Sequence, residues 1–538
     1  MPEILRTTII ATALLLSAVA GAHDHRAEGP EPLGKVHFDN SCSPAVAAEF
    51  DQGVSLLHSF WYDEARRAFA NVAKHDPKCV IAYWGLAMGY FQAVEHLPRG
   101  DEQKHGQQAI DKANKATRAT PRERAYVNAL TEIYNERKVP NRTARAQNYS
   151  DAMQRLSAQY AEDHEASLFY ALSLLNPELP DDPDLLRSGK ALTILNDLLK
   201  TEPDNPGIVH YIIHASDHPR LAQYGLDAAR RYAQVAPASA HALHMPGHIF
   251  ARLGLWEDDL RSNLASKAAA ESRSSLHIGA ENRLHAMEFL EYAYLQTGKD
   301  AQAAAIATEA ATVRAEELNP GFEGYYESVE ASFPARFALE MRDWAGAVAL
   351  QRGPGKLAQG CVVTYWAQAV GAGHLRDARS AANAQQRYRS CLLAEEQVAQ
   401  QKSRATHWVE VNAWTEFAQG DIEAALTLMR PLCDHQDKVG KGEVEIPARE
   451  MMGDMLLLAG RAREALAEYK VSLQTDPGRF NTLLHAGEAA QSLGLNDEAT
   501  GYYRALLQNA PDPSPLSNDA LRKAREFLVT WRSLPPAQ

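Results

Sequence analysis

The sequence of 538 residues predicts an all-α protein built as a solenoid of paired helices. A set of four residue types recurs with a spacing of 34 residues near the C-terminus. No segment alternates apolar and polar residues as a half-buried β-strand does, and turn signals separate segments of helical periodicity. With 45% apolar and 23% charged residues, the composition also excludes a disordered or collagen-like chain.

The recurring set is a small residue, a second small residue, an aromatic residue and a proline at fixed offsets. Its members are Gly453, Ala465, Tyr469 and Pro477, then Gly487, Ala499, Tyr503 and Pro511, and near the N-terminus Gly53, Ala65, Phe69 and Pro77. Small residues let the two helices of a pair cross closely, and an aromatic side chain fills the space around them. Proline ends the second helix. The pattern therefore predicts a helix-turn-helix unit at both ends of the chain.

With these offsets the chain resembles the tetratricopeptide repeat (TPR) family, whose unit is a helix-turn-helix of about 34 residues. The resemblance is most specific at 45–90 and 446–511. It implies a right-handed superhelix whose first helices line a concave groove, and it implies a protein or peptide bound in that groove. The segments Leu57–Tyr62 and His244–His248 are similar to those of poorly characterised exported bacterial TPR proteins, which implies no mechanism.

The N-terminal segment predicts export. Residues 1–22 combine one arginine, an apolar run and small residues before the expected cleavage points, which is the pattern of a signal peptide. The alternative is an uncleaved membrane anchor, although the run is short for a span. We expect a periplasmic or secreted protein without stable membrane insertion after cleavage, and a leader over 23–41. Export permits disulfides, and Cys42 and Cys79 flank the first predicted hairpin as a candidate pair.

The remaining chain divides at its loop signals. We expect a degenerate TPR-like helical array over 42–433, in which Thr120 to Glu123 reads as a capping box and Gly254 and Gly298 read as turns within units. A linker loop is predicted over 434–446, followed by a TPR pair and an end helix over 447–538. The net charge of −13 disfavours nucleic acid as a partner, because such binding needs a basic surface.

Histidines gather in the middle of the chain. The segment 210–285 holds His210, His214, His218, His241, His244, His248, His277 and His285. If Gly254 is the turn of its unit, then His241, His244 and His248 share one helix face, away from the packing stripe. The same alignment places His210 and His285 at the equivalent position of the neighbouring units. Three successive helices would then direct imidazoles toward one stretch of the groove.

Neutral imidazole is a common ligand of zinc and copper ions, and His210/His214 and His244/His248 have the i, i+4 spacing that lets two imidazoles share one ion. We predict a Zn or Cu site whose candidate ligands are His241, His244, His248, His210, His214, His285 and Glu288. Asp217 and Glu288 are also candidates for carboxylates that orient the imidazoles. A polar groove held by hydrogen bonds, a peptide site with histidine donors, and histidines paired internally remain alternatives.

Motifs for catalysis are missing from the sequence, which contains no HExxH, Walker A, CxxC, nucleophile-elbow or kinase signature. Two hypotheses of function remain. The first is an exported TPR binding or scaffold protein with a His-rich site in its groove. The second is a zinc or copper metalloprotein that handles metal or uses it in catalysis.

Overall fold

The computed structural model describes residues 33–272, 278–318, 323–353, 355, 357–394, 402–511 and 518–532. These residues form helices and loops without a β-strand, and they belong to one compact unit, Pro32–Gln538. The predicted signal peptide (1–22), the first part of the leader and His277 lie outside the described residues. The all-α fold class predicted from the sequence is confirmed.

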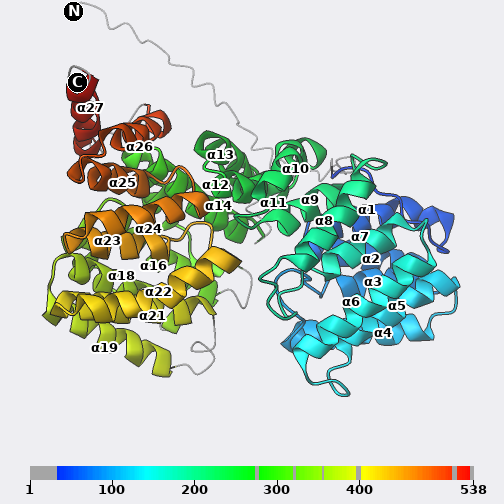
Figure 1. Ribbon diagram of the computed structural model, residues 1–538. Coiled ribbons are helices and arrows are strands. Elements are labelled where there is room, and N and C mark those ends of the chain that lie inside the picture. The colour runs from blue at the N-terminus through cyan, green and yellow to red at the C-terminus, as the bar shows by residue number, and fades with distance from the viewer. Residues whose placement is uncertain are drawn as a thin grey trace, which may run out of the picture. The chain divides into compact units, whose positions relative to one another are not determined.

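The N-terminal part of the array consists of one short 3-10 helix and eight α-helices (Figure 1). They are η1 (Pro44–Val46), α1 (Ala47–His58), α2 (Tyr62–His75), α3 (Val80–Met88), α4 (Gly100–Lys115), α5 (Pro121–Tyr134), α6 (Arg142–Gln159), α7 (His164–Ser173) and α8 (Leu186–Leu199). The capping box expected at Thr120 is present at the start of α5, where Thr120 and Glu123 each accept a hydrogen bond from the other's backbone.

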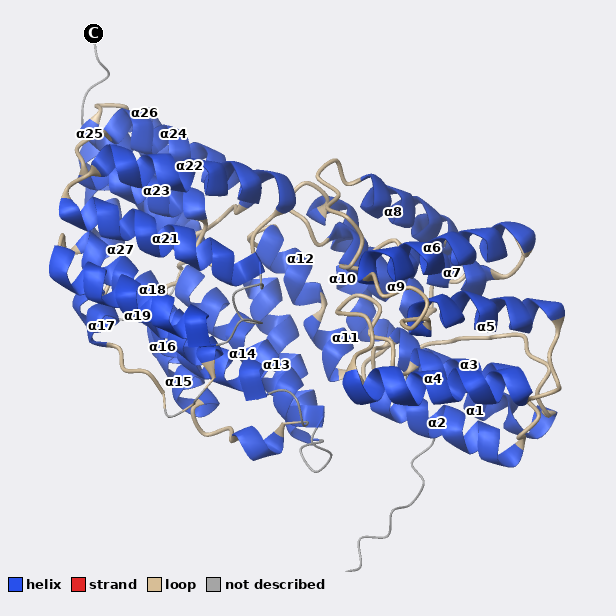
Figure 2. Cartoon of the chain, turned by 90° about the horizontal axis from the view of Figure 1, so that it is seen from below, coloured by secondary structure: helices blue, strands red, loops and turns tan. Residues whose placement is uncertain are grey.

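The middle and C-terminal parts continue the same pattern of consecutive helices that pack on one another (Figure 2). The middle part contains α9 (Pro206–Ser216), α10 (Ala222–Val235), α11 (Ala240–His244), α12 (Pro246–Arg252), α13 (Trp256–Ser272), α14 (Ile278–Gln296), α15 (Asp300–Ala310) and η3 (Ala315–Glu317). The C-terminal part contains α16 (Glu323–Glu340), α17 (Trp344–Ala349), α18 (Ala358–His374), α19 (Ala378–Ala394), α21 (Lys402–Gln419), α22 (Ile422–Val439), α23 (Ala448–Leu458), α24 (Ala462–Thr475), α25 (Phe480–Ser492), α26 (Asn496–Asn509) and α27 (Asn518–Arg532).

The recurring glycines permit the close packing of each helix pair. A Cβ atom added to Gly453 would lie 2.5 Å from the ring of Tyr469, and one added to Gly487 would lie 2.5 Å from Tyr503. The equivalent distance from Gly53 to Phe69 is 2.9 Å. These contacts join the small and aromatic members of the set within each unit. They give the TPR-like solenoid of helix-turn-helix repeats that the sequence predicts.

The hydrophobic core of the described residues runs along the array as three large clusters, with a small fourth cluster of Ala372, Ala381 and Ala418. One extends from Leu33 to Phe250, a second from Ala251 to Phe333, and a third from Ala335 to Ala524. Such continuity is expected of a repeat protein, in which each unit buries its apolar face against its neighbours.

The described part of the leader belongs to the first core. Phe38 is buried, and its ring contacts those of Phe50, Trp84 and Tyr126 at centroid distances of 5.2–5.6 Å. The sulfur atoms of Cys42 and Cys79 are bonded, with their Cα atoms 4.9 Å apart. This bond ties the end of the leader to the start of α3.

Two further features concern cysteines and the linker predicted over 434–446. Cys361 and Cys391 are also bonded, whereas Cys433 is a free, buried thiol. The first part of the predicted linker is helical, because α22 continues to Val439. Gly440 ends that helix with a positive φ of 83°, a conformation that glycine adopts without strain. Only 440–447 is a loop, and it packs against the middle of the chain.

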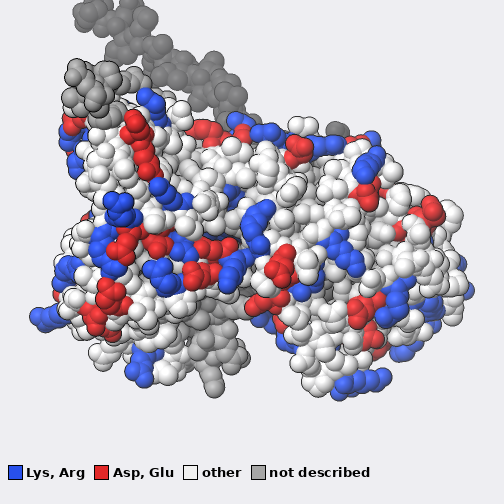
Figure 3. Space-filling model, viewed as in Figure 1, with Lys and Arg blue, Asp and Glu red and all other residues white. Residues whose placement is uncertain are grey.

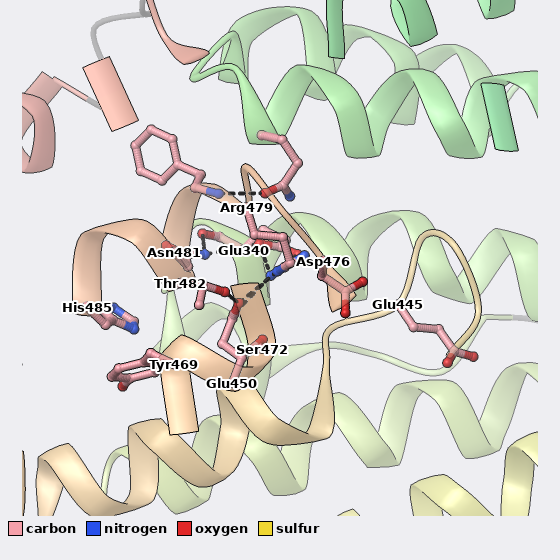
Figure 4. Close-up of polar contacts among 12 residues, drawn as sticks. Glu340, Glu445, Glu450, Tyr469, Ser472, Asp476, Arg479, Asn481, Thr482 and His485 are labelled. Atoms are coloured by element: carbon pink, nitrogen blue, oxygen red, sulfur yellow. Dashed lines mark hydrogen bonds and ion pairs between the residues drawn. The ribbon is translucent and has the colours of Figure 1, made fainter. Parts of the chain in front are cut away.

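A buried ionic cluster connects the middle and C-terminal helices (Figure 4). Arg479, whose side chain is fully buried, donates to Glu450 at 2.7 Å and to the hydroxyl of Tyr292 at 2.7 Å. Its Nη2 atom lies 3.0 Å from Oε1 of Glu340. Asn481 donates to the backbone oxygen of Glu340. Together these contacts join α14, α16, α23 and α25.

The exterior is mixed in charge. On the face drawn in Figure 3, acidic and basic side chains are interspersed. Within the described part of the chain, no helix is both long enough and apolar enough to span a bilayer.

Candidate metal centre

Six of the predicted histidines come together from four helices. His210 and His214 lie on α9, His241 and His244 on α11, His248 on α12, and His285 on α14. Helix α11 ends at His244, and α12 begins at Pro246. The structure groups the six imidazoles as two trios, in each of which three ligand atoms lie within 4.8 Å of one another.

The first trio, here called site A, contains His210, His214 and His241. The Nε2 atoms of His214 and His241 each lie 3.0 Å from Nε2 of His210. On the opposite side of its ring, Nδ1 of His210 donates to the backbone oxygen of His58 at 2.6 Å. The three imidazoles therefore point their Nε2 atoms toward one centre.

The second trio, here called site B, contains His244, His248 and His285. Nε2 of His244 lies 2.9 Å from Nε2 of His248. The ring centroid of His285 lies 4.4 Å from that of His244 and 6.0 Å from that of His248.

Each imidazole of site B has its other nitrogen engaged by an oxygen acceptor. Nδ1 of His248 lies 2.9 Å from a carboxylate oxygen of Asp217, and Nδ1 of His285 lies 3.4 Å from one of Glu288. Nδ1 of His244 lies 2.6 Å from Oδ1 of Asn263. An imidazole whose Nδ1 donates a hydrogen bond has a lone pair at Nε2 when it is neutral. One ligand nitrogen of each of the three imidazoles lies within 4.8 Å of the other two.

The orientation of the Asn263 amide follows from a further contact. Its nitrogen donates to Oδ1 of Asp259 at 2.6 Å and to the backbone oxygen of Asp259 at 3.1 Å. The amide oxygen is therefore the atom that faces His244. Burial raises the pKa of the Asp259 carboxyl well above its usual range. The chain Asp259–Asn263–His244 fixes Nδ1 of His244 as the donor.

The dimensions of both trios fit one metal ion each. Three imidazoles on a tetrahedral zinc ion, at metal–nitrogen distances of about 2.0–2.1 Å, have ring centroids about 5.2 Å apart and ligating nitrogens about 3.3 Å apart. The centroid distances are 4.7, 4.9 and 6.4 Å in site A and 4.4, 4.9 and 6.0 Å in site B. Because only three protein ligands converge in each trio, a fourth coordination position is left for water or another ligand.

Charged groups surround site B. Asp217 accepts from Arg252 at 3.0 Å, and Glu443 accepts from the same guanidinium at 2.8 Å. Glu443 comes from the loop 440–447, and its carboxylate lies 3.7 Å from Nδ1 of His248. Burial alone would lower the pKa of His248, but these two carboxylates raise it to about 10. In the metal-free protein a proton on His248 therefore separates the facing lone pairs.

Site A has a different electrostatic environment. Burial lowers the pKa of His214 to about 4 and holds the pKa values of His210 and His241 well below their ordinary value. The neighbouring imidazoles lower the pKa values of these three groups further. All three rings are therefore neutral near pH 7, the form in which imidazole binds a metal ion.

Glu288, which the sequence predicts as a ligand, is not one of the three converging groups of site B but contacts one of them, His285. Its carboxylate faces Nδ1 of His285, accepts from the hydroxyl of Tyr325 at 3.3 Å and lies 3.6 Å from Arg336. It thus occupies the alternative role of a carboxylate that orients an imidazole. His218 lies apart from both trios and contacts the backbone oxygen of Lys438 at 3.0 Å.

Sequence reasoning missed several groups around these sites, namely His58, Phe60, Asn263 and Glu443. Asn263 lies on α13, and its i, i+4 relation to Asp259 is a signal in the sequence that points to this pair. Glu443 lies 195 positions beyond His248 in the sequence, and no local pattern connects the two.

Comparisons with known proteins give a likeness of fold at most. No family model matches the sequence, and no curated protein matches it. Among solved structures, the chain is similar to the APC/C hetero-tetramer Cut9–Hcn1 at 13% identity, with 91% of this chain and 78% of that chain covered and a TM-score of 0.36. It is similar to the TPR domain of P58(IPK) at 16% identity, with coverages of 69% and 100% and a TM-score of 0.20. It is also similar to an IFIT1 monomeric mutant with m7Gppp-AAAA at 11% identity, with coverages of 88% and 98% and a TM-score of 0.35. The TPR-like fold of this chain rests on the glycine–aromatic packing within its own helix pairs.

Proposed function

We propose that this TPR-like protein is a metal-binding protein whose site B holds one divalent transition-metal ion, Zn(II) or Cu(II). The observation that carries the proposal is that one ligand nitrogen from each of His244, His248 and His285 lies within 4.8 Å of the other two, while Nδ1 of each ring faces an oxygen acceptor. Lone pairs of His244 and His248 that face each other at 2.9 Å repel unless a cation lies between them. A metal ion can be bound by all three imidazole nitrogens at once, whereas a proton is shared between two of them.

The arrangement of site B suits an exchangeable ion. Three imidazoles with a free fourth position form the ligand pattern of open zinc sites, whereas structural sites fill all four positions with protein groups. The side chain of His285 is 41% exposed, so the site has access to solvent. An ion held there would be able to accept a ligand from solution, as metal transfer and Lewis-acid chemistry both require.

Metal content tests this proposal directly. The tag-free mature chain, loaded with Zn(II) and desalted, is compared with a His244→Ala/His248→Ala variant and with His105→Ala. His105 is exposed on α4, remote from both trios in the sequence, and serves as the matched control. We expect the double variant to lose one ion per chain while the control keeps it. Equal metal content in the double variant and the wild type, with helical content intact in both, would refute the proposal.

A second candidate function is the binding of a protein or peptide, as the TPR-like array itself favours. Repeat solenoids present extended surfaces on which such partners bind. The experiment is affinity capture with the wild type and the His244→Ala/His248→Ala variant, each with and without a chelator. A partner retained equally in all four samples would support a scaffold function independent of metal. A partner lost from every sample without metal would assign its binding to the metal-loaded state.

We further propose that the protein is exported. The signal-like segment 1–22 supports this proposal, and so do the two cystine pairs, because disulfides persist in oxidising compartments. Cell fractionation followed by mass spectrometry of the mature N-terminus tests it. An intact Met1 on cytoplasmic protein would contradict it.

A further inference from the structure

In site A, two imidazole nitrogens approach a single hydrogen-bond acceptor, Nε2 of His210. Nδ1 of His210 donates to the oxygen of His58, so Nε2 of His210 carries a single lone pair. Nε2 of His214 and Nε2 of His241 both approach that lone pair at 3.0 Å. One lone pair accepts one well-aligned hydrogen bond, and the second imidazole is left with a poor partner. An ion at the centre would instead engage all three nitrogens.

The surroundings of site A are apolar and aromatic. The ring of Phe60 lies 4.3 Å from that of His210, 5.4 Å from that of His214 and 5.5 Å from that of His241. The ring of Tyr232 stacks on His210 at 5.1 Å. Among the hydrogen bonds of the described residues, none joins a carboxylate to an imidazole of this trio.

Two carboxylates whose charge acts on site A are engaged in contacts with other groups. Asp217 and Glu443 are the acidic groups whose charge acts on His214. Both accept hydrogen bonds from Arg252, and Asp217 also holds His248 of site B. Their negative charge is therefore shared with Arg252, and that of Asp217 also with His248. The acidic side of this region belongs to site B.

This contrast sets the charge of the ion that each site can hold. The cost of moving an ion from water into an apolar environment rises with the square of its charge, so a divalent ion costs about four times as much as a monovalent ion of the same size. Site B offsets that cost with the carboxylates of Asp217 and Glu288 beside its imidazoles. Site A offers neutral imidazoles, a backbone carbonyl and aromatic rings.

We propose that site A is a separate binding site for a monovalent transition-metal ion, Cu(I), beside the divalent ion of site B. Among monovalent ions, Cu(I) accepts imidazole nitrogen as a ligand, whereas alkali ions prefer oxygen. A Cu(I) ion bound by three neutral imidazoles adds only one positive charge to the apolar site. The two sites share α11, because His241 belongs to site A and His244 to site B, with ring centroids 6.5 Å apart.

Competition with a chromophoric Cu(I) chelator tests this proposal on the full mature chain. The titration is carried out without oxygen and with ascorbate, which keeps copper reduced and leaves disulfides intact. The wild type is compared with His241→Ala, a substitution at a partly buried ring, and with His248→Ala as the matched change in site B. We expect one Cu(I) per chain in the wild type and in His248→Ala, and at least a tenfold weaker affinity in His241→Ala, about the effect of losing a metal-site group.

A second variant tests the electrostatic reasoning, and its result can be interpreted even if His241→Ala does not fold. His214→Asp converts site A into two imidazoles and one carboxylate, a donor set that favours divalent ions. We expect this variant to lose Cu(I) affinity and to bind one additional Zn(II) per chain.

Two results would overturn the inference. One is an equal Cu(I) affinity in the wild type and in His241→Ala. The other is a wild type that binds two Zn(II) ions, one of which is lost in His241→Ala. Failure of the proposed function looks different, because it appears as Zn(II) content that His244→Ala/His248→Ala leaves unchanged.

Discussion

We predict that the carboxylate of Asp217, after the imidazoles themselves, is the group on which the proposed metal affinity of site B depends most. It holds Nδ1 of His248 at 2.9 Å and Nε of Arg252 at 3.0 Å, and its side chain is 15% exposed. Removing a carboxylate that orients a ligating histidine weakens metal affinity about 10- to 100-fold. We expect Asp217→Asn to weaken Zn(II) binding by that factor, equivalent to about 1.4–2.7 kcal/mol.

Two effects of this substitution act in opposite directions. The carboxylate also stabilises the proton on His248 in the metal-free protein, and that proton has to leave when the ion binds. A divalent ion interacts with the carboxylate more strongly than a proton does, because its charge is twice as large. The net result is a loss of affinity, accompanied by release of fewer protons on binding.

Competition with a chromophoric zinc chelator at neutral pH measures the loss. Asp204→Asn is the matched control, because the side chain of Asp204 is exposed and pairs with that of Lys35 at the surface. Glu288→Gln is expected to have a smaller effect than Asp217→Asn, since its contact with His285 is 3.4 Å long and Arg336 shares its charge. If Asp217→Asn binds Zn(II) within about twofold of the wild type while its melting curve shows an intact fold, the assigned role of Asp217 is wrong.

Three further predictions concern the scaffold. Arg479→Met should lower the free energy of unfolding by about 3–5 kcal/mol in chemical denaturation, because it leaves two buried carboxylates without their partner; a loss below about 1 kcal/mol would contradict this account of the cluster. Gly453→Ala should destabilise by about 1–3 kcal/mol through its contact with Tyr469, whereas Gly501→Ala, where a Cβ meets open space, should stabilise α26 by about 0.5–1 kcal/mol; the reasoning fails if both substitutions have the same sign. Burial lowers the pKa of His374 to about 3, so the unfolded chain binds a proton that the native chain does not, and stability falls as pH falls from about 6.5 toward 3. His374→Phe should reduce that slope by about 1.4 kcal/mol per pH unit between these values, and identical slopes would refute the prediction.

The fold was largely predictable from the sequence because the contacts that define each repeat form between residues close together in the chain. The contact between Gly453 and Tyr469 forms within one helical hairpin, so the spacing of the two residues in the sequence predicts it. Helix periodicity and proline positions supply the remaining boundaries. Residues 434–439 are an exception: the sequence predicts a linker there, yet they continue α22, where Asp434 and Asp437 accept hydrogen bonds from Arg449 of α23.

The candidate site was predictable in part. Repeat alignment brought the histidines of α9, α11, α12 and α14 into one region, since equivalent positions of successive units face the same way. Alignment has a resolution of about one helical turn, however, and cannot separate six imidazoles into two trios. His241 and His244 lie one turn apart on α11, yet His241 belongs to one trio and His244 to the other.

The protonation of the imidazoles depends on contacts distant in sequence, and so does the chemistry of the site. His248 and His285 are the same residue type, yet Nδ1 of His248 faces Asp217 and Nδ1 of His285 faces Glu288. Glu443 reaches the same site from the loop between α22 and α23, where Gly440 turns the chain inward. Two helical residues, Asn263 and Glu288, face Nδ1 of His244 and His285. The acidic groups at Nδ1 of His248, Asp217 and Glu443, lie outside the helices. The loop 440–447 is therefore as much a part of site B as the helices that carry its ligands.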